Sequence, residues 1–172
     1  ASIAVTHMRK ILALKSVGNF VYEADPKGAP LLADFARSAG FHLETTTLFD
    51  LASLSKPIAT TTMAMILYDR GMLELDAPIA GTLPEFLAGS SDPRRHEVTF
   101  RMLLAHSSGL PAYEKLFLKA SSRDDLLHAA FTTPLTADPG TRAEYSDIGF
   151  ILLGLALERL AEESLDIFSR RE

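Results

Sequence analysis

Apolar and polar positions follow two different periods along the chain. The runs ASIAVTH and ILALKSVGNFVYEA are rich in β-forming residues and meet at the polar residues Met8-Arg9-Lys10, which predicts a β-hairpin over residues 1–24. Residues 25–46 are predicted to be a connector that contains the turn-forming stretch DPKGAP and a short helix over residues 30–39. From residue 47 to residue 172 the pattern is mainly helical.

The helical region is predicted to contain a long first helix over residues 53–70 that ends at Gly71. Pro57 is tolerated only near a helix start, so it places Ser53 in the first turn. After the irregular connector ELDAPIAGTLPEF, the later helices are expected in TFRMLLAHSSGLP (capped by Thr99), SSRDDLLHAAFT and DIGFILLGLALERLAEES. Because the strands come first and the helices after them, the predicted fold class is α/β in the broad sense, with strands and helices in separate regions (α+β).

Two strands alone make a marginal sheet. The sequence also opens at Ala1 inside a predicted strand, so we expect the chain to be a piece of a longer protein. The remaining strands would then come from outside the chain, and a second chain that completes the sheet is one source of them.

The composition of the 172 residues, 47% apolar and 23% charged, is that of one folded domain. The net charge is −5 and no basic cluster occurs, which argues against nucleic-acid binding. No run reaches the roughly 18 apolar residues that a membrane span requires. Cysteine is absent and the histidines lack metal-ligand spacing, so we predict no metal site and no cofactor. Nothing in the sequence indicates the compartment.

The stretch Ser53-Leu54-Ser55-Lys56 carries the strongest chemical signal. Residues three apart share a helix face, so Ser53 and Lys56 are expected to point together. A serine hydroxyl becomes a nucleophile when a neighbouring base takes its proton, and lysine can do this if burial lowers its pKa. Alternatively, Ser53 simply caps the helix.

Four stretches, in order, resemble the class C-like branch of the serine β-lactamase and penicillin-binding superfamily: the opening hairpin, LFDLASLSKP, TFRMLLAHSSGLP and PGTRAEYSDIGFILLG. The resemblance implies the front part of a β-lactamase-like serine hydrolase fold and acyl transfer on a β-lactam, an ester or a D-amino-acid peptide. It implies Ser53 as nucleophile, Lys56 as its activator and Tyr145 as a second proton carrier, with the initial base left open between the last two. The implied substrate is a small molecule or is peptidoglycan-like.

The sequence departs from the family pattern in two places. Asp147 stands where the family usually has asparagine; it can cap the last helix, act electrostatically on Lys56 and Tyr145, or do both. The family's later Lys-Thr-Gly or His-x-Gly motif does not occur in the chain. A catalytically incomplete or partner-binding chain on the same fold therefore stays open as the alternative. His106 is expected to lie in a structural turn away from the nucleophile.

Overall fold

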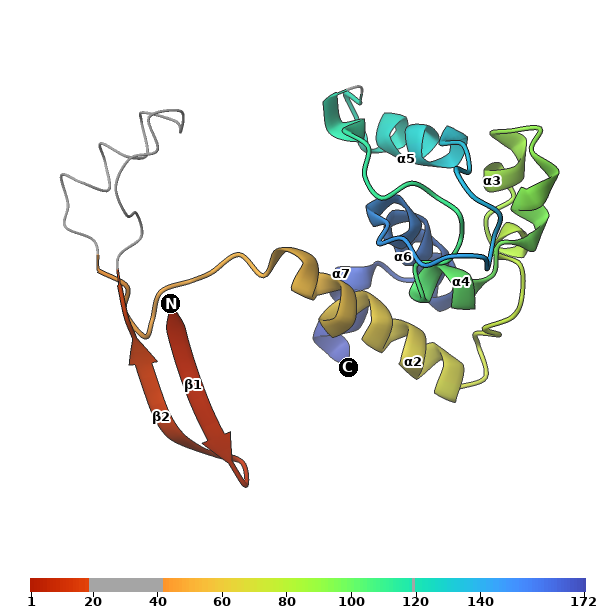
Figure 1. Cartoon of the computed structure of the whole chain (residues 1–172). Coiled ribbons are helices and arrows are strands. Elements are labelled where there is room, and N and C mark those ends of the chain that lie inside the picture. Colours follow the sequence, from red (N-terminus) through yellow and green to blue (C-terminus); the bar gives the residue numbers. More distant parts are fainter. Residues whose placement is uncertain (19–41, 119) are drawn as a thin grey trace, which may run out of the picture. The chain divides into compact units, whose positions relative to one another are not determined.

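The computed structural model describes residues 1–18, 42–118 and 120–172, which divide into two compact units, residues 1–50 and 51–172. The described strands belong to the first unit and the described helices to the second (Figure 1). The short helix predicted over residues 30–39 lies outside the described residues.

The first unit contains a β-hairpin that is shorter than the predicted range of residues 1–24, of which residues 19–24 lie outside the described residues. Strands β1 (Ser2–His7) and β2 (Lys10–Ser16) pair antiparallel, with an irregularity between Val5 and Thr6. Met8 and Arg9 form the connecting turn with φ of 47° and 64°, the left-handed conformation that matches the twist of paired strands. Apolar side chains point from both faces of this ribbon, which is typical of a sheet that is covered on both sides; they include Ile3, Val5, Leu12 and Leu14.

The predicted first helix is continuous in helical conformation but changes type along its length. It begins with the 3-10 turn η1 (Ala52–Leu54), continues as the π-helical η2 (Lys56–Thr61) and ends as α2 (Thr62–Asp69). Pro57 lies at the start of η2, where its missing amide hydrogen costs no bond within the helix. The expected glycine stop is present, because Gly71 has φ of 70°.

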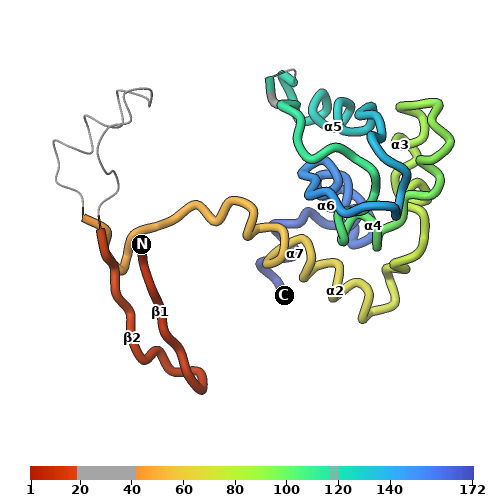
Figure 2. The backbone as a smooth tube through the Cα atoms, viewed as in Figure 1, coloured from red at the N-terminus to blue at the C-terminus, as the bar shows by residue number. Residues whose placement is uncertain are grey.

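Helix α6 (Asp147–Ala161) lies at the centre of the second unit and packs against α2 and the other helices (Figure 2). Its buried side chains, among them Leu152, Leu153 and Leu157, belong to the main hydrophobic core. The surrounding helices are α3 (Glu85–Ala88), α4 (Phe100–Leu104), α5 (Arg123–Thr132) and α7 (Leu165–Arg171), with 3-10 turns η3 (Ile79–Gly81), η4 (Pro93–Glu97) and η5 (Leu116–Leu118). The predicted cap of α4 is confirmed, since the Thr99 side chain accepts a hydrogen bond from the Met102 amide.

Residues 106–112 form a turn that is bonded to the loop before α6. Gly109 occupies the left-handed region at φ of 81°, and a Cβ atom there would lie 2.3 Å from the carbonyl oxygen of Ala137. Backbone hydrogen bonds run from Thr136 to Gly109, from Gly140 to Ser107, from Glu144 to His106 and from Asp147 to Ala112. The turn therefore sets where the loop enters α6.

A buried arginine, Arg95, connects three segments of the helical unit through hydrogen bonds. The Arg95 side chain is fully buried, and its guanidinium donates to the backbone carbonyl oxygens of Phe86, Phe131 and Thr133. It also lies over the Phe86 ring, 4.5 Å from the ring centre. Arg95 thus joins η4 to α3 and to the end of α5, although its sequence context suggests a surface residue.

We predict that Arg95→Met lowers the free energy of unfolding by about 3 kcal/mol, because it leaves three buried carbonyl groups without a donor. Arg94→Met is the matched control, since the Arg94 side chain is partly exposed and pairs with Asp92 and Asp138 at the surface. Urea denaturation measures both variants. Equal losses for the two would contradict the structural role of Arg95.

We also predict that Gly109→Ala lowers the free energy of unfolding by more than about 2 kcal/mol, because the added Cβ collides with backbone in a left-handed turn. Gly154→Ala in α6 is the control: nothing lies within 4 Å of its Cβ position. It should stabilise the helix by up to about 1 kcal/mol. Thermal unfolding of the two variants should therefore shift in opposite directions, and a common direction would contradict this reading of the turn.

Candidate active site

Ser53 and Lys56 meet at the junction of η1 and η2. Lys56 Nζ donates to Ser53 Oγ over 3.3 Å, and the Ser53 side chain is exposed. Ala52, directly before Ser53, has φ of 44°, a strained conformation for a residue with a Cβ atom. The shared helix face expected from the sequence is therefore present, and the serine lies on a tight turn open to solvent.

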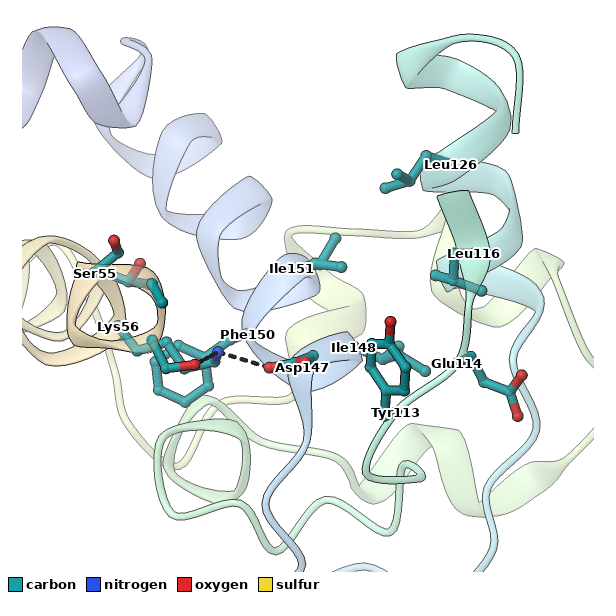
Figure 3. A pocket seen from close by; sticks show the side chains of 13 residues that line it. Ser55, Lys56, Tyr113, Glu114, Leu116, Leu126, Asp147, Ile148, Phe150 and Ile151 are labelled. Atoms are coloured by element: carbon teal, nitrogen blue, oxygen red, sulfur yellow. Dashed lines mark hydrogen bonds and ion pairs between the residues drawn. The ribbon is translucent and has the colours of Figure 1, made fainter. Parts of the chain in front are cut away.

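Lys56 also pairs with Asp147 at the start of α6. The Nζ atom lies 2.6 Å from Asp147 Oδ1, with 18% of the lysine side chain and 38% of the aspartate side chain exposed. Figure 3 shows this contact between two elements far apart in sequence. The cap of α6 is Ser146, whose hydroxyl accepts from the Gly149 amide, so the expectation that Asp147 caps the helix is wrong. The Asp147 carboxylate interacts with the lysine instead.

Tyr145 completes the group. Lys56 Nζ lies 5.0 Å from the centre of the Tyr145 ring, and half of the tyrosine is exposed. Hydrogen bonds with Lys56 and with Ser53 lower the pKa of the Tyr145 phenol below its ordinary value, against the opposing effects of burial and of the Asp147 carboxylate. The structure thus brings together the four residues singled out in the sequence: Ser53, Lys56, Tyr145 and Asp147.

The charge on Lys56 follows from the same contacts. Burial alone lowers the pKa of this lysine, but hydrogen bonds to Asp147 and Tyr145 outweigh burial and raise the Lys56 pKa above its ordinary value. The sequence leaves open whether burial lowers the Lys56 pKa enough for the lysine to act as a base; in this geometry its hydrogen bonds raise the pKa instead. Lys56 is an ammonium that can stabilise negative charge on its neighbours.

His106, in the turn of residues 106–112, contacts Tyr145 of the candidate site. Its ring centre lies 4.5 Å from that of Tyr145 and 4.8 Å from that of Phe150. The sequence predicts a structural turn away from the nucleophile Ser53, and the structure adds a contact of the His106 ring with Tyr145 that the sequence did not predict. His106 and Tyr145 are far apart in sequence, and hydrogen bonds between the turn and the loop before α6 hold the two segments side by side.

A cavity of about 460 Å³ opens beside Ser53, Lys56 and Asp147. The rest of the wall is largely apolar, with Tyr113, Leu116, Leu126, Ile148, Phe150 and Ile151, and it also includes Ala52, Ser55, Thr60 and Glu114. In Figure 3 these side chains line the space between η2, α5 and α6. Sequence reasoning missed the lining residues, because an apolar residue that faces a cavity carries the same pattern as one in the core.

Neither a metal site nor a membrane span is found in the part of the chain that the structure describes. Within residues 1–18, 42–118 and 120–172, no three His, Asp or Glu side chains gather as metal ligands would. None of the helices in these ranges has the length and apolar character to cross a membrane.

The family model described as Beta-lactamase matches residues 1–172. The esterase EstB of Burkholderia gladioli is 35% identical over 149 residues, which are 78% of this chain and 37% of EstB. A putative D-alanyl-D-alanine carboxypeptidase of Escherichia coli K12 is 34% identical over 131 residues, 71% of this chain and 30% of that protein. The chain thus spans about a third of the length of these curated relatives.

Solved structures agree with the sequence relatives. A penicillin-binding protein from Bacillus halodurans aligns with a TM-score of 0.63 and 29% identity, over 78% of this chain and 41% of that one. A class C β-lactamase from Rhodobacter sphaeroides aligns with a TM-score of 0.52 and 30% identity, over 69% and 32% of the two chains. The predicted fold class and family are confirmed. The chain belongs to the β-lactamase family, the serine hydrolases that include esterases, carboxypeptidases and β-lactamases.

Proposed function

We propose that the protein transfers acyl groups through an ester formed on Ser53. The observation that carries this proposal is the contact of one ammonium, that of Lys56, with both the Ser53 hydroxyl and the Asp147 carboxylate, beside the Tyr145 phenol. The substrate classes are those that relatives' names give, an ester, a β-lactam or a D-alanyl peptide.

In the proposed reaction Tyr145 accepts the proton of Ser53 as the serine oxygen attacks the substrate carbonyl. The pKa of the phenol is lowered from its ordinary value and that of Lys56 is raised, and these directions favour Tyr145 over Lys56 as the base. The backbone amide of Ser53 is one donor for the oxyanion. Tyr145 then returns the proton to the leaving group as the carbonyl–leaving group bond breaks. Water, activated in the same way, finally hydrolyses the acyl-serine.

One observation favours a second candidate, a chain that binds a peptidoglycan-like ligand or a partner without turnover. Asp147 neutralises the Lys56 charge at 2.6 Å and works against ionisation of Tyr145. Such a site would hold a carbonyl compound against Ser53 without activating the hydroxyl. The two candidates differ in whether Ser53 becomes acylated.

We predict that a p-nitrophenyl ester adds one acyl group to the wild-type chain, seen as a single mass increase by intact-mass spectrometry. Ser53→Ala should show no adduct, because the nucleophilic oxygen is gone. Ser55→Ala is the matched control from the same turn and should still be acylated. A wild-type chain without adduct favours the binding function, and an adduct that persists in Ser53→Ala contradicts the assignment of the nucleophile.

We predict that Asp147→Asn moves the pH profile of Ser53 acylation to lower pH by on the order of one unit. The Asp147 carboxylate raises the pKa of Tyr145, so its removal lets the phenol ionise at lower pH. It also raises the pKa of Lys56, so its removal lets the ammonium lose its proton at lower pH. The acidic limb of the profile, set by Tyr145, and its alkaline limb, set by Lys56, therefore both move to lower pH.

The control for this experiment is Asp124→Asn, which makes the same change in the first turn of α5. Stopped-flow release of p-nitrophenol measures the profiles. A profile of Asp147→Asn that coincides with those of wild type and Asp124→Asn would rule out an electrostatic role for Asp147.

A further inference from the structure

His106 stands out as a titratable residue that the proposed reaction does not use. Its Nδ1 atom accepts a hydrogen bond of 3.0 Å from the backbone amide of Ser146, the residue between Tyr145 and Asp147. Its ring contacts the rings of both Tyr145 and Phe150. His106 itself has φ of 55°, a left-handed backbone conformation that few residues other than glycine adopt.

We infer that His106 is a positioning residue that acts only when neutral: its Nδ1 lone pair and its ring hold the Tyr145–Asp147 segment against Ser53 and Lys56, and protonation of the imidazole releases that segment. The inference rests on the proposed function, since it assigns His106 a part in the acylation of Ser53.

The tautomer follows from the contact with Ser146. An amide N–H donates, so Nδ1 must carry a lone pair and the ring proton must sit on Nε2. Protonation would place an N–H on Nδ1 directly opposite the Ser146 N–H. Two donors then face each other at 3.0 Å, and one of them has to move.

This contact is the pH-sensitive one among the anchors of the segment. Besides the ion pair of Asp147 with Lys56, the other anchors use backbone or hydroxyl groups: the Glu144 amide donates to the His106 carbonyl, the Ser146 hydroxyl to the Pro111 carbonyl and the Asp147 amide to the Ala112 carbonyl. None of these groups titrates between about pH 5 and pH 8, whereas an imidazole does. A fall in pH therefore removes one anchor and leaves the rest.

The charges around His106 oppose its protonation. Burial and the Lys56 ammonium lower its pKa, and the Asp147 carboxylate opposes them less strongly. Of the other groups that face the ring, Tyr145 is neutral when protonated, and Phe150 is apolar. The carboxylate of Glu144 is paired with Arg142. His106 is thus held neutral near pH 7 and becomes charged only in more acidic solution.

NMR of the wild-type chain tests the inference without requiring catalysis. We expect the ¹⁵N shifts of His106 to show the Nε2–H tautomer at pH 7, and the Ser146 amide proton and the Tyr145 ring signals to move along the His106 titration curve. The positioning role of His106 would be overturned by an Nδ1–H tautomer, or by Ser146 and Tyr145 signals that do not change as His106 titrates. The exposed His128 serves as the internal reference.

The functional arm compares two amide variants by p-nitrophenyl ester acylation. Asparagine places its oxygen where Nδ1 stands and tolerates positive φ, whereas glutamine places its oxygen one bond farther out. We expect His106→Gln to acylate at least about tenfold more slowly at pH 7 than His106→Asn, because the Tyr145–Asp147 segment loses its anchor. Equal rates in the two variants would overturn the positioning role.

The pH dependence separates positioning from a general effect on folding. In the wild type the rate should fall more steeply with decreasing pH once His106 is protonated, and His106→Asn should lack this extra slope. His128→Asn is the matched control and should keep it. If the wild type is not acylated at all, acyl transfer fails as the function, while the NMR titration still decides whether His106 holds Tyr145.

Discussion

The ammonium of Lys56 is the group on which the site depends. It contacts the Ser53 hydroxyl from its own helix, and it reaches the Asp147 carboxylate and the Tyr145 ring across the interface between η2 and α6. A cation in this place favours negative charge on Tyr145 and is itself favoured by Asp147. The lysine pKa and the tyrosine pKa therefore move in opposite directions for one physical reason.

The backbone of the helical unit keeps these side chains in reach of one another. Pro57 accompanies the π turn that carries Lys56, and the Ser146 cap starts α6 so that Asp147 is its first residue. The turn of residues 106–112 is bonded to the loop before α6 and fixes the entry of that helix. Precise positions of reacting groups come from such packed elements more readily than from exposed loops.

The sequence predicted those parts of the structure that depend on local pattern. The hairpin follows from alternation around a polar turn, the shared face of Ser53 and Lys56 from their spacing, and α6 from an apolar run after a capping residue. Local pattern alone did not predict the contacts between distant segments; the meeting of Tyr145 and Asp147 with Lys56 was expected only from the family resemblance. The capping position could be assigned only to within one residue, and that one residue separates a cap at Ser146 from an ion pair at Asp147.

Two further residues show the limit of local reasoning. Arg95 lies in a charged stretch and is nevertheless fully buried against backbone carbonyl groups of distant residues. His106 lies in a turn whose local pattern indicates structure alone, and its ring reaches Tyr145 because the chain returns beside it. No spacing rule connects residues that meet only after the helices pack.

The most direct test of this account is a titration of Tyr145 by ¹³C NMR of tyrosine-labelled protein, with Tyr145→Phe to assign the signal among the four tyrosines. The account predicts that Tyr145 ionises below the ordinary range of a tyrosine and that Lys56→Met returns it to that range or above. A Tyr145 that titrates as an ordinary tyrosine in the wild type, with no response to the loss of Lys56, would contradict it.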